Sequence, residues 1–392
     1  MPQTAAQQLI KDIESLARLD NRYEDLTCVN LDGAKRTGVC SLVFKARDIQ
    51  NNSDVSIKFI EPMHLGIAYR LKAFEREPDI LEVLKGTPRC VDLIEGCKHF
   101  TWQLDNNGMP VNITIPYFVC EWLDGDVESI FLEQQNYEAL FKLKLFREIV
   151  LAVRAFHSKE VFHRDLKKDN FRKRAADDCV VAIDFGTAAG KKRTKTVNTE
   201  DYPSEPVGAN AFSPPEAFIT PLGSHREIGT QYDVYALGAL LFDLFNVDHF
   251  VKHRAATNFD NLLSILSMQV AGTSDEDALL AKWREVITAH EKSVAKMKLN
   301  GRGNTIPKAV MSLLNDLFNS MVHINLDKRI SLESCLKKID SAIRVMENDA
   351  LQRRRLKINA IRRRNRLRKI EAREKRLLEH LANKRIAGTS NV

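Results

Sequence analysis

The sequence predicts an α+β protein in two unequal parts, a small antiparallel sheet carrying one helix and then a larger, mainly helical part, with a basic helix at the C-terminal end. Three observations predict this. Strand-like patterns dominate residues 26–119, helical periods dominate beyond Asp124, and the charge changes near residue 350. With 392 residues, 44% hydrophobic and 28% charged, the chain can bury one large or two medium cores and lacks the composition of a disordered or fibrous protein.

The first part begins with a short helix, which we expect over residues 7–19 (QQLIKDIESLARL) because its apolar residues recur at helical spacing. Strand patterns follow, interrupted by an amphipathic helical segment at about 68–84. The strand segments are TCVNL at 27–31, CSLVFKAR at 40–47, VSIKFI at 55–60 and IPYFVCEWL at 115–123.

The second part has three long helical periods, at 137–158, 232–245 and 309–322, and two short apolar strands at 161–162 and 180–183. Residues 186–214 are rich in Thr, Lys, Gly, Ser and Pro and show almost no apolar period. A compact domain keeps such a stretch only as a functional or mobile loop. We find no internal repeat.

Neither export nor membrane insertion is predicted. The start has no basic segment followed by an apolar one, and the longest apolar run, near 234–245, contains Asp243 and is too short to cross a bilayer. Seven cysteines without a CxxC pair fit reduced thiols better than disulfides or a zinc site. We therefore expect a cytoplasmic protein, or a nuclear one if the source cell has a nucleus.

The basic residues are concentrated at the C-terminal end. Residues 351–392 carry 15 Lys/Arg and 3 Asp/Glu, a net charge of +12, whereas residues 1–350 carry −5. Apolar residues recur there in a 3-4 alternation with gaps, so an appended amphipathic helix is expected over 346–385. Residues 351–386 could bind nucleic acid, dock on an acidic partner or on the body of the protein, or be a solvated helix that only aids solubility.

Residues 162–171, FHRDLKKDNF, are densely charged, and such a run is usually an idle surface turn. However, His163, Arg164, Asp165, Lys167 and Asn170 have the spacing of the HRDxKxxN catalytic loop of protein kinases. This stretch therefore resembles a catalytic loop and not an idle surface turn.

Further matches follow in the order that this family requires. Asp184-Phe185-Gly186 stands nineteen residues after Asp165 and resembles the DFG motif, and Glu77 stands nineteen residues after Lys58 of the VAIK-like segment VSIK. The other matches are Pro214-Pro215-Glu216 for APE, residues 233–238 for the DxWSxG helix start, and Arg329 for the arginine that pairs with the APE glutamate.

The chain thus resembles the eukaryotic-type serine/threonine protein kinases over about residues 25–345. The resemblance implies a bilobal fold, with an N-lobe over about 25–122 and a C-lobe over about 123–345. A helical extension at 1–24 and the basic tail at 346–392 would flank it. ATP and Mg²⁺ are the implied cofactors, and protein substrates the implied partners, with autophosphorylation expected.

The same resemblance assigns the charged residues to phosphoryl transfer, in which the protein mainly positions the nucleotide and neutralises charge. Asp165 would take the hydroxyl proton of the substrate, and Lys167 would offset charge at the γ-phosphate, as in Ser/Thr-type kinases. Asn170 and Asp184 would bind Mg²⁺. Lys58 would hold the α- and β-phosphates while Glu77 fixes it, with Glu75 as the competing glutamate.

The nucleotide-covering segment and the base pocket depart from the family pattern. Residues 36–43 align with G-x-G-x-x-G-x-V, but only Gly38 and the final Val43 match, so backbone approach to the phosphates is restricted. Cys120 takes the gatekeeper position, and the backbone of Glu121 to Leu123 would bond adenine. Arg172 stands where an apolar residue usually lies beneath the base, so either the register shifts there or its stem packs on the ring.

The long loop departs as well. Ala209 replaces the threonine of the GTxxYxAPE segment, and Glu205 stands four residues before it, where the family often carries an activating phosphate that Arg164 binds. We expect Glu205 to supply part of that charge, with Thr194, Thr196, Thr199 and Ser204 as alternative phosphate acceptors.

Three classes of function remain: an active serine/threonine kinase, a pseudokinase scaffold that signals through its conformation and basic tail, and a small-molecule kinase. The last class shares Asp165 and Asn170 but generally lacks the PPE-like segment and the DxYALG helix found here.

Overall fold

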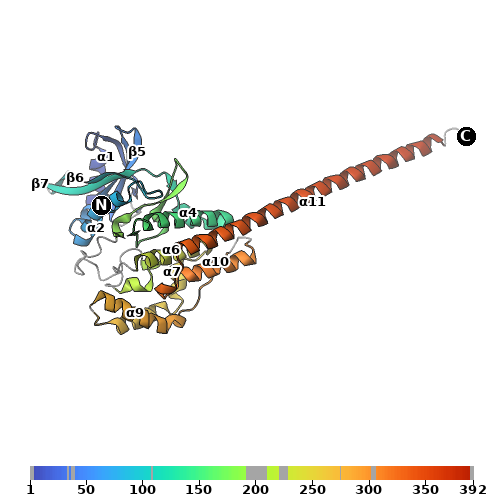
Figure 1. Cartoon of the computed structure of the whole chain (residues 1–392). Coiled ribbons are helices and arrows are strands. Elements are labelled where there is room, and N and C mark those ends of the chain that lie inside the picture. The colour runs from blue at the N-terminus through green and yellow to red at the C-terminus, as the bar shows by residue number, and fades with distance from the viewer. Residues whose placement is uncertain are drawn as a thin grey trace. The chain divides into compact units, whose positions relative to one another are not determined.

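The computed structural model describes residues 4–32, 35–36, 40–106, 109–190, 210–219, 228–273, 275–301 and 306–388 (Figure 1). A five-stranded antiparallel sheet with helix α2 forms the N-terminal region, and helices dominate the region that follows. The α+β architecture expected from the sequence is confirmed.

The sheet has the strand order β1-β4-β5-β7-β6, and each neighbouring pair is antiparallel. Its strands are β1 (Tyr23–Cys28), β4 (Ser41–Asp48), β5 (Ser53–Ile60), β6 (Leu93–Asn106) and β7 (Met109–Glu121). Phe44 and Phe59 pack edge to face with ring centroids 5.5 Å apart. Such apolar pairs on alternating positions give the sheet one buried face.

Within the strand-like region 26–119, only residues 115–123 of the long β6–β7 hairpin were assigned to a particular strand. Residues 93–114 carry little apolar alternation, and Met109 and Val111 near the turn are exposed. The two strands stay paired out to Asn106 and Met109. Pairing with the partner strand, and not burial, therefore forms the outer part of this hairpin.

Helix α2 (Ala68–Leu84) has the predicted bounds and contacts β6 and the short 3₁₀ helix η4 (Phe185–Thr187). Its buried side chains include Phe74, Ile80 and Leu81, together with the carboxylate of Glu77. A charged residue on the buried face of a helix requires a partner, and α2 carries Glu77 toward the interior of the protein.

Helix α1 (Ala5–Glu14) is shorter than the predicted helix 7–19. Thr4 and Gln7 form a capping box at its start, and Leu9 and Ile13 are buried. After it, Leu19 pairs with Tyr23, and the intervening Asp20 and Asn21 have left-handed φ angles of 53° and 56°. A right-handed helix cannot contain such residues, so this turn separates α1 from β1.

The helical region is built around α4 (Ala139–His157) and α6 (Gly229–Phe245), both largely buried. Gly238 of α6 lets α10 (Lys308–Met321) and the following turn approach, because a Cβ at this position would lie 2.6 Å from Val322 Cγ1. The other helices are α3 (Glu128–Leu132), α7 (Phe250–Ala255), α8 (Phe259–Val270) and α9 (Glu276–His290).

Short strands position the loops between α4 and α6. β10 (Phe171–Arg174) pairs with β11 (Cys179–Ala182) on one side and β8 (Gly125–Asp126) on the other, and β9 (Val161–Phe162) pairs with β12 (Ala189–Gly190). The strands expected at 161–162 and 180–183 are therefore present, the second ending at Ala182. Two two-residue strands, β2 (Leu31–Asp32) and β3 (Lys35–Arg36), form a separate hairpin.

Single 3₁₀ turns connect many of these elements. They are η1 (Pro62–His64), η2 (Gln134–Asn136), η3 (Lys168–Asn170), η4 (Phe185–Thr187), η6 (Asn210–Phe212), η7 (Pro215–Phe218), η8 (Glu291–Ser293) and η9 (Leu326–Lys328).

The basic C-terminal segment is helical, as expected, but its helix begins earlier. α11 runs from Leu332 to Gly388, whereas the tail helix was predicted from residue 346. The chain divides into two compact units, 1–340 and 341–392, so the division lies inside α11. Among the described residues, no helix combines the length and apolarity needed to cross a membrane.

Candidate active site

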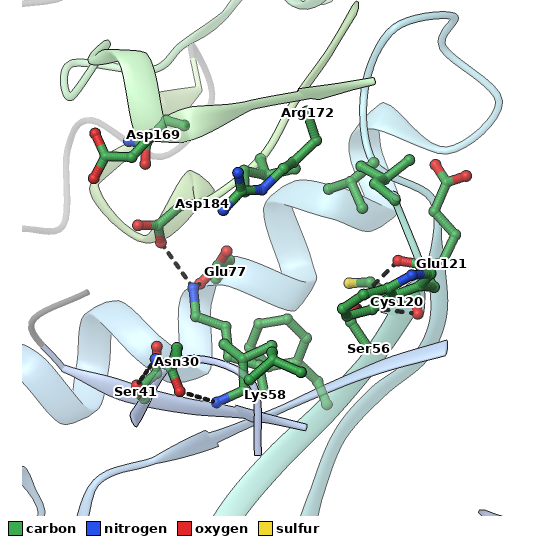
Figure 2. A pocket seen from close by; sticks show the side chains of 18 of the residues that line it. Asn30, Ser41, Ser56, Lys58, Glu77, Cys120, Glu121, Asp169, Arg172 and Asp184 are labelled. Atoms are coloured by element: carbon green, nitrogen blue, oxygen red, sulfur yellow. Dashed lines mark hydrogen bonds and ion pairs between the residues drawn. The ribbon is translucent and has the colours of Figure 1, made fainter. Parts of the chain in front are cut away.

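A cavity of about 220 Å³ lies between the five-stranded sheet and the short strands of the helical region (Figure 2). Most residues that the sequence assigned to cofactor or metal binding line it: Val43, Lys58, Glu77, Glu121, Leu123, Asn170 and Asp184, together with Lys167. Asp165 is not among the lining residues, and Gly38 lies outside the described part of the chain.

Lys58 is the central cation of this cavity. Lys58 is a residue of β5. Its Nζ atom lies 2.7 Å from Glu77 Oε2 of α2 and 2.7 Å from Asp184 Oδ1 (Figure 2). Glu75 is exposed, so the structure pairs Lys58 with Glu77 and not with its competitor. The nineteen-residue spacing thus brings a strand residue and a helix residue together.

The charges of this cluster shift one another's pKa values. Burial opposes the cation, but the Asp184 and Glu77 carboxylates raise the pKa of Lys58. Burial, assisted by the Asp184 charge, raises the pKa of Glu77 above its usual range. At Asp184, burial opposes ionisation, yet the neighbouring Lys58 cation lowers the pKa of the carboxyl. Strongly shifted groups in a cavity are typical of functional sites.

Helix α2 also holds the backbone that follows Asp184. Phe185 N donates to Glu77 Oε1 at 3.0 Å, and Arg76 Nη2 donates to the carbonyl of Gly186 at 2.9 Å. Asp184 itself has a left-handed φ of 63°. Non-glycine residues in this conformation cost energy and persist where surrounding contacts enforce them, often at functional sites.

The charged loop at 162–171 is fixed by Asp233 of α6. Its carboxylate accepts the backbone N–H groups of His163 at 2.9 Å and Arg164 at 2.8 Å, and His157 Nε2 lies 2.7 Å away. Because Asp233 is fully buried, its need for partners holds the loop in one conformation. The loop is therefore not a solvated surface turn.

Three side chains of this loop gather beside the cavity. Asn170 Nδ2 donates to the Asp165 carbonyl at 2.7 Å and to its carboxylate at 3.3 Å, and Lys167 Nζ lies 3.6 Å from Asp165 Oδ2. Burial opposes the charge of Lys167, but Asp165, Asp169 and Asp184 raise its pKa. Lys167 is therefore cationic at neutral pH.

His163 and Arg164 support the loop in different ways. The His163 ring packs 4.8 Å from that of Phe185 and its Nε2 lies 2.9 Å from the Ile183 carbonyl, so His163 packs against the residue that follows Asp184. Arg164 donates from Nε and Nη2 to the carbonyl of Thr187. Glu205, Ala209 and the four candidate phosphate acceptors lie outside the described residues, so the expected charge partner of Arg164 stays a prediction.

The linker between the sheet and the helical region offers a backbone edge to the cavity. Glu121 N donates to Asp92 O at 3.0 Å and Ser56 Oγ to Glu121 O at 3.1 Å, whereas the N–H and C=O of Leu123 have no partner within the described residues. Leu123 lines the cavity. A ligand with adjacent donors and acceptors can therefore pair with Leu123.

Two polar residues of the site had no sequence prediction. Asn30 extends the β1–β4 ladder with its side chain, accepting from Val43 N and donating to Ser41 O, both at 2.8 Å (Figure 2). Arg174 of β10 pairs bidentately with Glu121 and also donates to Cys90 O. The only available signal was an asparagine near the end of the strand segment 27–31 and an arginine in the charged run after residue 171, both too common to identify a site residue.

The predicted pair between Glu216 and Arg329 is present away from the cavity. Arg329 Nη2 lies 2.9 Å from Glu216 Oε2, Nη1 contacts Oε1, and both side chains are fully buried. Carbonyls of His323 and Gln231 accept further N–H groups of Arg329. This closed arrangement links η7 to the end of η9.

The cavity carries oxygen atoms that suit a divalent cation. Asn170 uses its amide NH₂ on Asp165, which leaves its carbonyl oxygen as a ligand, and Asp184 binds Lys58 through only one carboxylate oxygen. Such hard oxygen donors fit Mg²⁺. Within the described residues, no group of three or more His, Cys, Asp or Glu side chains could hold a metal ion.

Comparison with known proteins decides the family. Residues 37–339 match the family model of the protein kinase domain, more than half of the chain. The chain belongs to the protein kinase domain family. The two-lobed kinase fold that the sequence implied is confirmed, with the five-stranded sheet in the N-lobe and the helices from α3 to α10 in the C-lobe.

Named relatives are distant kinases. A probable serine/threonine-protein kinase of Dictyostelium discoideum is 26% identical over 259 residues, covering 66% of this chain and 38% of that protein. The mitogen-activated protein kinase spm1 of Schizosaccharomyces pombe is 26% identical, covering 58% and 51%. The serine/threonine-protein kinase PknA of Nostoc is 28% identical, covering 56% and 36%. The kinase chain thus spans only about a third to a half of their lengths.

Proposed function

We propose that this protein is a serine/threonine protein kinase that transfers the γ-phosphate of ATP to Ser/Thr hydroxyls of proteins, including its own. One observation carries the proposal: the Lys58–Glu77–Asp184 cluster lines the same cavity as Lys167 and Asn170, which both contact Asp165. Phosphoryl transfer needs such an array of positioning and charge-neutralising groups.

The N-lobe side would position the nucleotide. Lys58, held by Glu77, supplies a cation for the α- and β-phosphates, and the backbone of Leu123, which has no partner within the described residues, would bond the adenine ring. Val43 and the backbone of Glu121 complete the pocket, with Gly38 assigned to the nucleotide-covering segment from the sequence. Bound Mg²⁺, held by Asn170 and Asp184, would supply charge neutralisation between the phosphates.

The C-lobe side would act on the acceptor. Asp165 is oriented by Asn170 and lies 3.6 Å from Lys167, so its carboxylate can accept the hydroxyl proton while the lysine offsets negative charge on the γ-phosphate. Lys167, two residues after Asp165, is what favours a serine/threonine acceptor over tyrosine.

The test is phosphate transfer from labelled ATP, with Mg²⁺, to the protein itself and to a generic protein substrate. We expect transfer by the wild type and a loss of about 10³-fold or more in Asp165→Asn, which keeps the shape of the side chain. Matched thermal unfolding of both proteins excludes misfolding as the cause. ATP binding without transfer above the Asp165→Asn level would replace this proposal with the pseudokinase alternative.

We also propose that the exposed cationic part of α11, residues 351–369, binds nucleic acid or another polyanion. Leu351, Leu356, Ile361 and Leu367 are exposed there among nine described Lys and Arg residues. Such a helix neutralises phosphates and releases counterions, so its affinity should fall steeply with salt. Replacing residues 362–364 by glutamine should weaken duplex binding, whereas lysine at the same positions should preserve it. Equal binding by both variants would contradict the proposal.

A cytoplasmic location is proposed on the basis of the cysteines. All seven lie in the described part of the chain outside any disulfide, and three of them are buried, which fits a reducing compartment. Oxidation of the purified protein under mild conditions should form no intramolecular disulfide. Rapid, specific pairing of two cysteines would argue against this location.

A further inference from the structure

Arg172 projects from β10 into the cavity, and the proposed phosphate transfer gives it no role (Figure 2). Its register is fixed from both sides, because it pairs with Val181 of β11 and with Asp126 of β8. The chain does not shift there. The arginine therefore occupies the position where the sequence comparison placed the residue beneath the base.

The alternation of β10 directs Arg172 toward the cavity. Phe171, one residue earlier, is fully buried beneath it, and Lys173, one residue later, pairs with Asp178 at the surface. Successive side chains of a strand point to opposite faces. Arg172 is thus a lining residue by the geometry of the strand, and not a surface side chain that has folded inward.

A carboxylate pairs with the guanidinium. Arg172 Nη1 donates to Asp126 Oδ1 at 2.9 Å, and Asp126 also accepts the backbone N–H groups of Glu128 and Ser129 in the first turn of α3. Gly125 allows β8 to come this close, because a Cβ there would lie 2.3 Å from Lys173 Cβ. The pair is partly exposed, with 32% of the Arg172 and 50% of the Asp126 side chain accessible, and it favours this orientation of the guanidinium without a ligand.

Strand pairing places the backbone of Arg172 near the linker, because β10 pairs with β8, which follows Leu123 of the linker by two residues. Lys58, Asp184 and Lys167 form the charged cluster of the cavity. On the N-lobe side the lining includes Val29 and Val43, which offer an apolar surface to a flat ring.

We propose that Arg172 recognises the nucleotide base by stacking its guanidinium plane on the aromatic ring, so that a cation replaces an apolar contact in base binding. This rests on the proposed nucleotide-binding function of the cavity. A planar, weakly hydrated guanidinium stacks on aromatic faces, and its positive charge favours electron-rich rings. Adenosine without phosphates should then depend on Arg172 as strongly as ATP does.

The experiment measures dissociation constants of adenosine and of ATP by calorimetry for the full chain and three variants. Arg172→Met keeps the aliphatic stem without the guanidinium, Arg172→Lys keeps the charge without the plane, and Lys173→Met is the matched control on the opposite face. We expect Arg172→Met to weaken both ligands by about three- to tenfold, Arg172→Lys to lie between, and Lys173→Met to bind as wild type.

Three results would overturn this inference. Unchanged affinity in Arg172→Met would show that the stem alone contacts the base. A loss confined to ATP would assign Arg172 to the phosphates. Lack of binding of either ligand by the wild type would remove the pocket function itself. Failure of the kinase proposal is distinguishable, because adenosine binding that depends on Arg172 in a protein without phosphate transfer would contradict only the catalytic proposal.

Discussion

Two ion-pair systems of this kinase differ in how far they are closed. Glu216 and Arg329 satisfy each other bidentately with both side chains fully buried, and backbone carbonyls take further N–H groups of the arginine. The Lys58 cluster instead borders a cavity and has two carboxylates for one cation, and the Asp184 side chain, although surrounded by protein, is 42% accessible and lines that cavity. The first system is complete without a ligand, whereas the second retains groups that a ligand can engage.

This difference teaches that charge alone does not identify a functional site. A closed pair adds little net stability by itself, but removing one partner is costly because the other charge then stays buried without a partner. An open cluster tolerates loss of one member, since another partner remains, but it then loses the geometry that a ligand needs. Identical substitutions in the two systems should therefore affect different properties.

Breaking the closed pair should have the largest effect on stability. In Glu216→Gln, the Arg329 cation loses its carboxylate and stays buried, so the free energy of unfolding should fall by about 3–5 kcal/mol. Urea denaturation followed by circular dichroism measures this loss. A change below about 1 kcal/mol would show that the carbonyls of His323 and Gln231 suffice for the arginine.

Much of this contrast could be predicted from the sequence, because motif spacing reports which residues a fold brings together. Lys58 with Glu77, and Glu216 with Arg329, were paired correctly, and α2 was placed at its observed bounds. These predictions succeeded because they rest on strong periodicity or on several residues at fixed spacing.

The rest depends on tertiary contacts that no local pattern encodes. Glu121 pairs with Arg174, which lies 53 residues later in the sequence. The side-chain amide of Asn30 accepts the backbone N–H of Val43, as a strand carbonyl would. The β6–β7 hairpin continues past its buried part through pairing alone, and α11 extends from Leu332 without a composition change at that point. Each is settled by a partner whose position follows only from the complete fold.

Lys142 of α4 sharpens the comparison, because within the described residues no carboxylate pairs with it. Its Nζ donates to Gln134 Oε1 at 2.6 Å and lies 5.6 Å from the Phe245 ring centre, and burial lowers its pKa to about 8. The unfolded chain then binds the proton more tightly than the folded one between about pH 8 and 10.5.

The free energy of unfolding should therefore rise by up to about 3 kcal/mol across that pH range because of Lys142, and this contribution should be absent in Lys142→Met. Denaturation of both proteins at a series of pH values gives the difference and cancels other titrating groups. Lys144→Met, on the exposed side of the same helix, is the control and should keep the wild-type slope. A parallel pH dependence in Lys142→Met would contradict this account.

Glu77→Gln is the open-cluster counterpart of Glu216→Gln and should cost only about 1 kcal/mol of stability. Lys58 keeps Asp184, a glutamine oxygen can still accept Phe185 N–H, and the substitution removes a carboxylate whose burial raises its pKa. Phosphate transfer, in contrast, should fall by at least about tenfold because Lys58 is no longer fixed. Equal losses of stability in Glu77→Gln and Glu216→Gln would remove the distinction between the two systems.

Arg174 and Glu121 form an intermediate case with the smallest expected effect. Their side chains are 19% and 20% exposed, and the pair joins β10 of the C-lobe to the linker that lines the cavity. Arg174→Lys retains the charge but cannot reproduce the two parallel bonds to Glu121 or the third to Cys90 O, so unfolding should become easier by about 0.5–1 kcal/mol. High salt should shrink this difference, because a partly exposed pair is screened. A loss that is large and independent of salt would instead place this pair with the closed system of Glu216 and Arg329.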